Sequence, residues 1–586
     1  MKLNSTALRI LEAKYLKSNE TPELMCQRVA HAVAKAEIGI AKELYEKEFE
    51  DILTNLDFLP NSPCLMNAGQ EMAMLFACYV LPIEDSLDSI MTSLHSTATI
   101  FKAGGGVGFN FSKLRPKDSR IKTSGGKSSG PVSFMRMYDV MTDIIKQGGV
   151  RKGAMMSVLN INHPDIEEFI QCKQDITAYN NINISVGITN EFMLAVLNEE
   201  DWTLEHPKVT EKITIPDKKL FDLIVDCAWK TGEPGVLFID TINQTNPFFE
   251  THGMIDATNP CGEQTLYAWE SCVLGSINLA NMVNNHQINV DKIKKTVELA
   301  VRFLDNCITV NDYPLQEIKN ITQANRKIGL GIMGFADMLV KLEIPYNSPD
   351  AFLIAAKVMN LIDMFAQKYS EQLGDEKGYF PSLKDADIKC PRRNSVLTTI
   401  APTGTISMIA GCSSGIEPYF MLTYYRNMLG TTVIECNELF KQALVKAKKS
   451  EAEIDNIIKK VFANNGSCQG IEEVPEYMQK VFLTAQDINY EAHVHIQSIF
   501  QEFVGASISK TINLPQSATR EDVYNAFMLA WDKNCKGMTV YRDGCRGAVY
   551  TTNVENTNLC PECKSELDKT EKCRTCKNCG WSKCNV

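Results

Sequence analysis

Short apolar runs alternate with long amphipathic stretches over most of the chain, and this alternation constrains the fold more than any other feature. The runs FACYVLP, SVLTTIAP and KTINLP have the character of buried strands. Helical periodicity appears near 136–147, 191–199, 291–309 and 350–374. Because strands that alternate with helices are typical of α/β proteins, residues 61–545 are predicted to form one large α/β body.

The segments on either side of this body differ from it in composition. The tripeptide Thr-Pro-Glu at 21–23 combines an N-cap, a first-turn proline and an acidic residue that the helix dipole favours, so residues 1–60 are expected to be helical. Residues 546–559 are polar and poor in core-forming side chains, which is typical of a linker. They lead to a cysteine-rich tail at 560–586.

The charge and the apolar content exclude several classes of protein. A net charge of -11 argues against a broad surface for nucleic acid or anionic membranes, because such surfaces carry an excess of Lys and Arg. The chain has no apolar run long enough to span a membrane and no signal-peptide pattern, so a cytoplasmic location is expected. In that setting, twenty cysteines indicate metal binding or redox chemistry instead of a disulfide framework.

Three stretches rich in glycine and hydroxyl side chains could approach a phosphate closely: KAGGGVGFNFSKLR (102–115), TSGGKSSGP (123–131) and APTGTIS (401–407). None has the spacing of a P-loop, and each alone is more often a tight turn. APTGTIS is the best candidate, because it follows an apolar run and precedes a predicted helix. It is therefore predicted to bind a diphosphate.

The tail contains two CxxC pairs separated by nine residues, the spacing of a tetrahedral zinc ribbon. The predicted zinc ligands are Cys560, Cys563, Cys573 and Cys576. Cys579 and Cys584 remain, and a dithiol at a chain end could exchange disulfides with another site. Two alternatives stay open: any four of the six cysteines bind zinc, or the ribbon binds nucleic acid.

The segment NPCGEQ places Cys261 between Asn259 and Glu263, and Cys272 follows eleven positions later. A nucleophilic cysteine works as a thiolate and prefers positive neighbours that lower its pKa. A carboxylate so close discourages the thiolate. Cys261 is therefore not expected to act as an ordinary nucleophile.

A longer set of motifs follows the order of one known family: NSPCLMNAG, ACYVLPIEDSLDSI, GGGVGFNFSKLR, SSGPVSFM, GGVRKGAMMSVLNINHPDIEEFI, NPCGEQ, APTGTIS, GCSSGIEPYF, SKTINLP and TVYRDGCR. With the tail, they span roughly residues 5–586. On these motifs the chain resembles the large catalytic subunit of ribonucleotide reductases, most closely the class II, adenosylcobalamin-dependent members. The resemblance implies a ten-stranded α/β barrel with a central finger loop, a helical N-terminal region and a zinc-ribbon-like tail.

The resemblance also implies a radical role for the finger-loop cysteine. Cys261 would become a thiyl radical, started by adenosylcobalamin, and would abstract the ribose 3'-hydrogen. Glu263 would accept the 3'-hydroxyl proton and Asn259 would hold the ribose hydroxyls. Cys78 and Cys272 would reduce the substrate and form a disulfide. The tail pair Cys579 and Cys584 would reduce that disulfide again, and thioredoxin or a similar donor would renew the tail pair.

Further residues match the family's binding sites. Ribonucleoside diphosphates are the expected substrates, with triphosphates left open. The substrate-binding positions implied by the resemblance are Ser62, Ala77, Gly106, Thr403, Gly404, Thr405 and Ser407. Those for dNTP or ATP specificity effectors are Asp85, Ser86 and Arg115, with GGVRKGAMM (148–156) as a flexible sensing loop. Because the family's effector site lies at a dimer interface, a homodimer is expected.

The class assignment depends on departures from the other classes. Class I subunits receive a radical through two adjacent tyrosines, and here the first of these positions is Val540 beside Tyr541. The glycyl-radical motif of class III enzymes does not occur. The DxHxxG cobalamin motif is also missing, so cobalamin is expected to bind base-on. The region around His493, His495 and SKTINLP is a candidate for its contacts. The short N-terminal region is expected to lack an ATP-cone, so shut-off by dATP is not expected.

Two rival interpretations remain. One is a class I-type catalytic subunit that needs a separate radical-generating subunit. The other is a non-catalytic nucleotide-binding protein with a zinc ribbon. The eleven cysteines without a predicted role are expected to pack in the interior.

Overall fold

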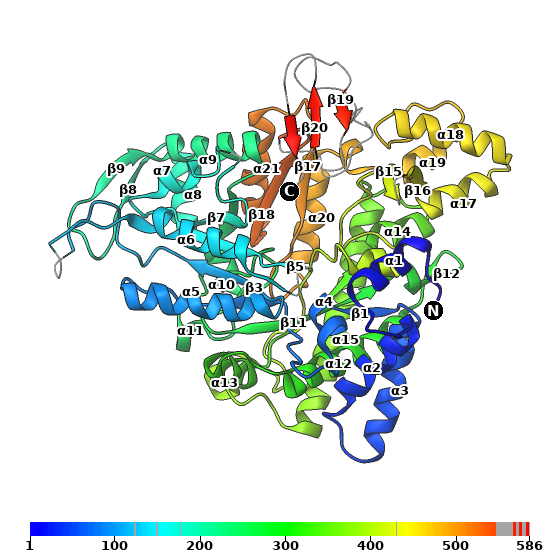
Figure 1. Cartoon of the computed structure of the whole chain (residues 1–586), viewed down its shortest axis with the longest axis horizontal. Helices are drawn as coiled ribbons and strands as arrows, with labels where there is room; N and C mark the ends of the chain where they lie inside the picture. The colour runs from blue at the N-terminus through cyan, green and yellow to red at the C-terminus, as the bar shows by residue number, and fades with distance from the viewer. Residues whose placement is uncertain are drawn as a thin grey trace. The chain divides into compact units, whose positions relative to one another are not determined.

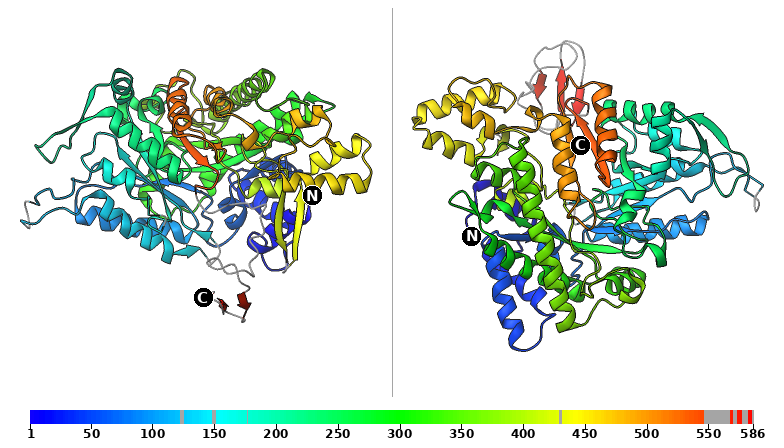
Figure 2. Two further views of the ribbon diagram at one scale, coloured as in Figure 1. Left: turned by 90° about the horizontal axis from the view of Figure 1, so that it is seen from above. Right: turned by 180° about the vertical axis from the view of Figure 1, so that it is seen from behind.

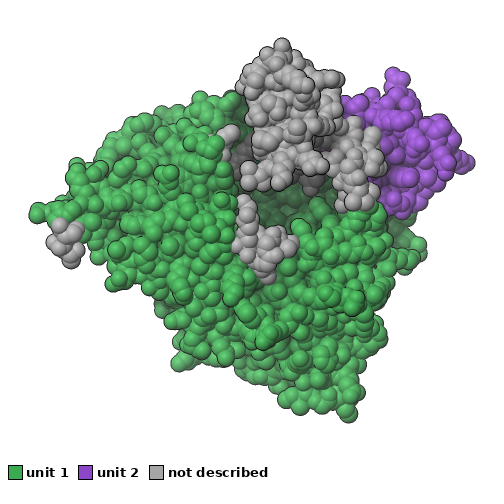
Figure 3. Space-filling view, in the orientation of Figure 1, with its two compact units in different colours: residues 1–420, 485–546 green, residues 421–484, 547–586 purple. Residues whose placement is uncertain are grey.

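The structure is a computed structural model that describes residues 1–121, 125–147, 151–175, 177–428, 431–545, 567–569, 573–576 and 582–584. The chain divides into two compact units, which Figure 3 shows in different colours. The larger unit comprises Met1–Phe420 and Ala485–Arg546, and the smaller comprises Met421–Thr484 and Gly547–Val586.

The larger unit begins with three helices, α1 (Ser5–Lys14), α2 (Pro22–Ala34) and α3 (Ile40–Thr54). Helix α2 starts as predicted, because the Thr21 side chain accepts a hydrogen bond from the Leu24 backbone N–H. The segment that follows α3 is not helical, since β1 (Phe58–Pro60) joins the main sheet.

The main sheet has ten strands in the order β1-β11-β2-β3-β6-β7-β10-β18-β17, and β14 pairs with β11 outside this path. Their bounds are β2 (Cys78–Val80), β3 (Gly106–Asn110), β6 (Met155–Asn160), β7 (Ile182–Ile188), β10 (Gly235–Phe238), β11 (Ser271–Asn278), β14 (Ile328–Met333), β17 (Thr511–Leu514) and β18 (Gly537–Arg542). Strands β2, β3, β6, β7 and β10 pair in parallel, which requires helical crossovers. The result is an α/β fold of the barrel type.

The predicted strand SVLTTIAP is not a regular strand. Isolated bridges pair Thr398 with Leu330 and Ile400 with Ile508, so this run lies between β14 and the segment that leads into β17. An apolar run with this composition cannot be distinguished from a regular strand by its sequence.

Helices follow the strands, and the four helical stretches predicted from periodicity are present in α6, α8, α12 and α15 (Figure 1). The helices of the larger unit are α4 (Ser62–Asn67), α5 (Leu87–Lys102), α6 (Gly130–Ile144), α7 (Ile166–Gln171), α8 (Asn190–Asn198), α9 (Asp217–Thr231), α10 (Ile239–Gln244), α11 (Phe249–His252), α12 (Val290–Val310), α13 (Gln316–Asn325), α14 (Phe335–Lys341), α15 (Pro349–Lys377), α16 (Ile406–Ala410), α20 (Tyr490–Gln501) and α21 (Arg520–Asp532). Short hairpins β4–β5, β8–β9 and β12–β13 lie at Lys146–Gln147 and Arg151–Lys152, at Asp201–Leu204 and Ile213–Pro216, and at Val283–Asn284 and Gln287–Ile288.

A buried ion network connects the N-terminal helices to the rest of the larger unit, where α12 packs against α2, α3 and α15 (Figure 2). The Arg302 guanidinium on α12 donates to both carboxylate oxygens of Glu37, at 2.8 and 2.9 Å. It also lies 3.7 Å from the centre of the Tyr45 ring. Burial alone would raise the pKa of Glu37, but hydrogen bonds from Arg302, Lys377 and Asn306 lower it to about 2. Glu37 therefore stays ionised, and its ion pair with Arg302 is maintained.

The smaller unit contains β15 (Thr423–Met428), β16 (Thr431–Cys436), α17 (Glu438–Lys446), α18 (Glu451–Ala463) and α19 (Glu476–Val481). Its part of the tail forms β19 (Leu567–Lys569), β20 (Cys573–Cys576) and β21 (Ser582–Cys584), with Cys573 opposite Cys584 in the register. The predicted linker at 546–559 and Cys560, Cys563 and Cys579 lie outside the described residues. No helix in the described part of the chain has the length and apolar character to cross a bilayer.

The glycines of GGGVGF serve both a tight turn and close packing. Gly104 lies in the turn before strand β3, with φ of 85°, whereas Gly106 and Gly108 lie on β3, under the loop that carries NPCGEQ. A Cβ atom at Gly108 would lie 1.7 Å from the Thr258 carbonyl oxygen, and one at Gly106 would lie 2.7 Å from Pro260. Glycine is required here because a backbone segment crosses the strand in direct contact.

We expect Gly108→Ala to displace this loop and to destabilise the larger unit by about 3 kcal/mol, since the added methyl group overlaps backbone that cannot rotate away. Denaturant titration of the full chain measures the change in the free energy of unfolding. Gly505→Ala is the matched control, because its Cβ would come no closer than 3.4 Å to another side chain. Equal stability of the two variants would contradict the packing role of Gly108.

Candidate active site

The loop between α11 and β11, residues 253–270, folds back on itself as a finger. The Asn259 N–H donates to the Gln264 carbonyl at 3.2 Å, and the Gln264 N–H donates to the Asn259 side chain at 3.0 Å. A bridge between Thr258 and Thr265 closes the base of this turn. The tip of the loop therefore presents Cys261, which is exposed, while Asn259 and Glu263 are buried beside it.

Side chains and backbone from the surrounding strands hold the finger loop in place. The Thr399 hydroxyl and the Ser507 N–H both donate to the Glu263 carbonyl, at 2.8 and 2.9 Å. The Asn183 side chain on β7 donates to the Pro260 carbonyl at 2.9 Å. The backbone on each side of Cys261 is thus fixed by hydrogen bonds, which limits the positions that its thiol can take.

A row of residues across three neighbouring strands supports the tip of the loop. On β2, Cys78 is directly opposite Cys272 of β11 on one side and Gly106 of β3 on the other. Pro260 of the finger loop lies over Gly106. The sheet register therefore brings two cysteines, separated by almost two hundred residues in the sequence, next to the loop that carries a third.

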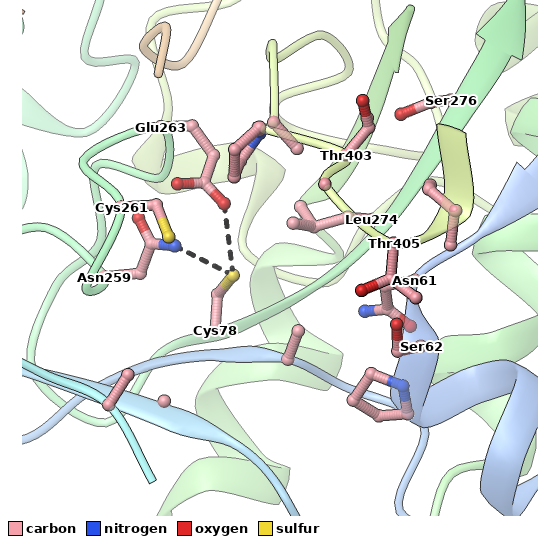
Figure 4. A pocket seen from close by; sticks show the side chains of 18 of the residues that line it. Asn61, Ser62, Cys78, Asn259, Cys261, Glu263, Leu274, Ser276, Thr403 and Thr405 are labelled. Atoms are coloured by element: carbon pink, nitrogen blue, oxygen red, sulfur yellow. Dashed lines mark hydrogen bonds between the residues drawn. The ribbon is translucent and has the colours of Figure 1, made fainter. Parts of the chain in front are cut away.

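A cavity of about 320 Å³ lies over this row. The residues that line it and were predicted as site residues are Ser62, Ala77, Cys78, Gly106, Asn259, Cys261, Glu263, Thr403, Gly404 and Thr405. Figure 4 shows Asn259, Cys261, Glu263 and Cys78 on one side of the cavity, and Ser62, Thr403 and Thr405 on the other. One side of the cavity thus carries thiols and a carboxyl group, and the other side carries hydroxyl groups.

Two of the predicted catalytic and substrate-binding residues do not line this cavity. Cys272 is fully buried behind Cys78, where its thiol donates to backbone carbonyls of Val273 and Lys327 at 3.4 and 3.7 Å. Ser407 is also buried, and its hydroxyl lies 3.0 Å from that of Ser414. Ser407 can therefore support the hydroxyl side of the cavity without reaching the lining.

Burial keeps the acidic groups of the site protonated to a higher pH than usual. It raises the pKa of Cys78 well above its ordinary value, and the neighbouring Glu263 raises it further. Burial also raises the pKa of Glu263 to about 7, although hydrogen bonds from Asn259 and Cys78 oppose the shift. The Cys78 thiol accepts from the Asn259 side chain at 3.0 Å and lies 3.7 Å from Glu263 Oε1. Glu263 Oε2 is buried and has no hydrogen-bond partner in the described part of the chain.

The hydroxyl side of the cavity is shaped for close approach of a ligand. Thr403 has a left-handed backbone, with φ of 51°, and its side chain accepts from the Gly415 N–H at 2.8 Å. A Cβ atom at Gly404 would meet nothing within 4 Å, so this glycine leaves open space beside the loop. Hydroxyl groups and accessible backbone N–H groups are suited to phosphate oxygens.

The sequence did not indicate several lining residues. Lys14 and Tyr15 come from the end of α1, Asn61 precedes α4, and Leu274 and Ser276 lie on β11. The Tyr15 hydroxyl lies 2.7 Å from that of Ser62. No local pattern marks these residues, because only the tertiary fold brings α1 beside the APTGTIS loop, where it packs against α16.

The predicted effector residues lie outside the cavity. The Arg115 guanidinium forms an ion pair with Asp85 at 2.8 Å, and Ser86 caps α5 by accepting from the Ser89 N–H. Part of the predicted sensing loop, residues 148–150, lies outside the described residues. The structure therefore brings Asp85, Ser86 and Arg115 together at the start of α5.

His493, a candidate cobalamin contact, is not available to a ligand. It is fully buried, its Nε2 lies 3.1 Å from the Ala485 carbonyl and its Nδ1 lies 3.1 Å from Lys510 Nζ. Burial and the Lys510 charge lower the pKa of His493. Both ring nitrogens are engaged, so the imidazole belongs to the interior packing. The described residues contain no cluster of three or more potential metal-ligating side chains.

Comparisons with known proteins place the chain beside ribonucleotide reductases. The family description "Ribonucleotide reductase, all-alpha domain" matches residues 1–73, and "Ribonucleotide reductase, barrel domain" matches 76–391 and 382–541. A vitamin B12-dependent ribonucleoside-diphosphate reductase from Thermoplasma acidophilum is 46% identical over 91% of this chain and 70% of that protein. One from Mycobacterium tuberculosis H37Rv is 41% identical over 98% of this chain and 83% of that protein.

A solved structure shows the same fold. The Actinobacillus ureae class Id ribonucleotide reductase alpha subunit superposes with a TM-score of 0.79 over 92% of this chain and 97% of that one, at 23% identity. Together, the matched domains, the shared fold and the two similar proteins show that the chain belongs to the ribonucleotide reductase family.

Proposed function

We propose that this chain reduces ribonucleotides to 2'-deoxyribonucleotides by thiyl-radical chemistry that adenosylcobalamin starts. One observation carries the proposal: an exposed thiol at a loop tip shares a cavity with a protonated second thiol and a carboxyl group whose pKa is raised to about 7. Hydrogen-atom transfer requires S–H groups, and burial beside a carboxyl group favours the S–H form of Cys78.

The proposed roles follow from the positions of the side chains. The Cys261 thiyl radical removes the 3'-hydrogen atom of the ribose, and Glu263 takes the 3'-hydroxyl proton through its free buried oxygen. Asn259 Nδ2, which donates to the Cys78 sulfur at 3.0 Å, is near enough to orient both the thiol and a ribose hydroxyl. Cys78 protonates the departing 2'-hydroxyl, which leaves as water.

The electron pair for the reduction comes from the two cysteines that face each other across β2 and β11. Cys78 and Cys272 each lose a hydrogen and form one disulfide, while the substrate exchanges its 2'-hydroxyl for hydrogen. One ribonucleotide and two thiols thus give one deoxyribonucleotide, one disulfide and one water, and Cys261 recovers its hydrogen at the end.

The tip of the finger loop fits the approach of a large cofactor. Cys261 is exposed, and a Cβ atom at Gly262 would meet nothing within 4 Å. When bound there, adenosylcobalamin supplies the carbon-centred radical that activates Cys261.

The proposal extends to the substrate, the reductant and the tail. We infer diphosphate substrates from the names of the two similar proteins, with phosphates on Ser62, Ala77, Gly106, Thr403, Gly404 and Thr405, and with the buried Ser407 supporting that loop. Cys579 and Cys584 are proposed to reduce the Cys78–Cys272 disulfide and to be renewed by thioredoxin. Zinc binding by Cys560, Cys563, Cys573 and Cys576 rests on their spacing.

Effector control and dimerisation are part of the same proposal. Helices α5 and α6 expose apolar side chains, namely Leu87, Met91, Val140 and Ile144, and Leu87 begins α5 two residues after Asp85 of the Asp85–Arg115 pair. Apolar surface of this kind favours a second copy of the chain as a partner.

For the fold, we propose that the ten strands form a closed barrel, which the bridges at Leu330–Thr398 and Ile400–Ile508 support.

The first prediction concerns the radical cysteine. Cys261→Ser is expected to abolish deoxyribonucleotide formation and to change nucleotide affinity by less than about twofold, because serine keeps the shape but cannot form the sulfur radical. Product analysis and equilibrium binding measure the two effects. Cys390→Ser is the control, since Cys390 is also exposed but does not line the cavity. Undiminished turnover in Cys261→Ser would rule out the thiyl mechanism.

The second prediction concerns pH. Glu263 must be ionised to accept a proton. The rate of single-turnover reduction by pre-reduced enzyme should therefore rise with pH, and the midpoint of the rise should lie at a pH of about 7. No fall is expected at the pKa of an ordinary cysteine, about 8.5, because the Cys78 pKa is higher. Glu263→Gln should lower the rate at least about a hundredfold. A rate independent of pH between 5 and 9 would exclude this base, provided nucleotide binding stays constant over that range.

The third prediction separates this proposal from the class I rival. The purified chain with adenosylcobalamin, dithiothreitol and a ribonucleoside diphosphate, without oxygen, is expected to make deoxynucleotide without a second protein. Tyr541→Phe should retain at least about half of that activity, because Val540 interrupts the tyrosine pair on β18. Product formed only after addition of a metal-containing partner protein, and lost in Tyr541→Phe, would favour the rival.

A further inference from the structure

The substrate cavity contains one cation that no part of the proposed mechanism uses. Of the described residues that line the cavity, Lys14 alone has a positively charged side chain, and Glu263 alone has a carboxyl group. Lys14 is exposed at the end of α1 and has no ion-pair partner in the described part of the chain. An unpaired ammonium group at the wall of a cavity is a ready partner for an anionic ligand.

Tyr15, the residue after Lys14, shows that this cation lies on the hydroxyl side of the cavity. Tyr15 is buried, and its hydroxyl lies 2.7 Å from the hydroxyl of Ser62, which Figure 4 shows on the same side as Thr405. Helix α1 also packs against α16, the helix that follows the APTGT loop. Lys14 therefore lies away from the thiols, beside the groups that we propose for phosphate binding.

Further contacts hold this wall of the cavity together. The Arg28 guanidinium on α2 donates to the carbonyls of Ala68 and Leu65 at the end of α4, at 2.6 and 3.2 Å. Ser62 begins α4, so α2 holds the far end of the helix whose near end contacts Tyr15. The position of Ser62 is thus set by two elements of the N-terminal region.

We propose that Lys14 contacts the terminal phosphate of the ribonucleotide and that Tyr15 positions Ser62 for the same phosphate chain. The inference rests on the proposed function and adds a specificity role for the N-terminal helices. A nucleoside monophosphate fills the site only as far as the Thr403–Thr405 loop, whereas a diphosphate extends to the cation of α1. Lys14 thereby favours substrates with two or more phosphates over monophosphates.

Equilibrium binding of CDP and CMP to the full chain tests this inference without turnover. Lys14→Met is expected to weaken CDP binding about tenfold and CMP binding by less than about twofold, because only CDP reaches the lost charge. Lys14→Arg should restore most of the CDP affinity. Lys17→Met is the matched control: it removes an exposed lysine three positions away that does not line the cavity, and it should bind both nucleotides normally.

Turnover adds a second measurement. Lys14→Met and Tyr15→Phe should raise KM for CDP severalfold with kcat within about twofold, since neither residue lies beside the reacting thiols. Equal weakening of CDP and CMP in Lys14→Met, or CDP binding as tight as in the unaltered chain, would overturn the inference and leave the proposed function intact. Failure of the unaltered chain to bind CDP at all would instead contradict the proposed function as well.

Discussion

The close contact between strand β3 and the finger loop is the constraint on which the rest of the site depends. The Thr258 carbonyl lies where a side chain at position 108 would begin, and Pro260 lies over Gly106. Only hydrogen atoms at these two positions allow the loop to enter the sheet. Because Gly106 pairs with Cys78, and Cys78 pairs with Cys272, the same contact sets the separation between the loop cysteine and the cysteine pair beneath it. A shift of the loop would therefore disturb all three thiols together.

The same packing selects the chemistry of the site. An enclosed environment with few countercharges penalises every ionised form, so Cys78 stays a thiol and Glu263 is half protonated near neutral pH. A site built for thiolate attack would instead place a cation beside its cysteine. Here the only cation of the described lining is Lys14, on the hydroxyl side. The distribution of charge thus separates a region without a cation, for radical chemistry, from a region with a cation, for phosphate.

The sequence predicted the parts of this arrangement that depend on local pattern. Amphipathic periodicity located α6, α8, α12 and α15, and the NPCGEQ segment pointed to unusual cysteine chemistry before any resemblance was considered. It could not show that the glycines of β3 accommodate another backbone, since glycine clusters also make turns and phosphate loops. Nor could it show that SVLTTIAP forms only bridges, or that α1 reaches the cavity. Those features depend on contacts between residues far apart in the chain.

The N-terminal helices therefore belong to the site as well as to the fold. The Arg302–Glu37 pair is buried, so removing one partner would leave an uncompensated charge in the interior. The cost of leaving such a charge keeps α2 and α3 attached to α12. The hydrogen bonds from Arg28 to backbone carbonyls attach α4 to α2 in turn. The Tyr15 and Ser62 hydroxyl groups then meet at the hydroxyl side of the cavity wall. The buried ion pair of the N-terminal region thus affects the site indirectly, because it helps to hold one wall of the phosphate side in position.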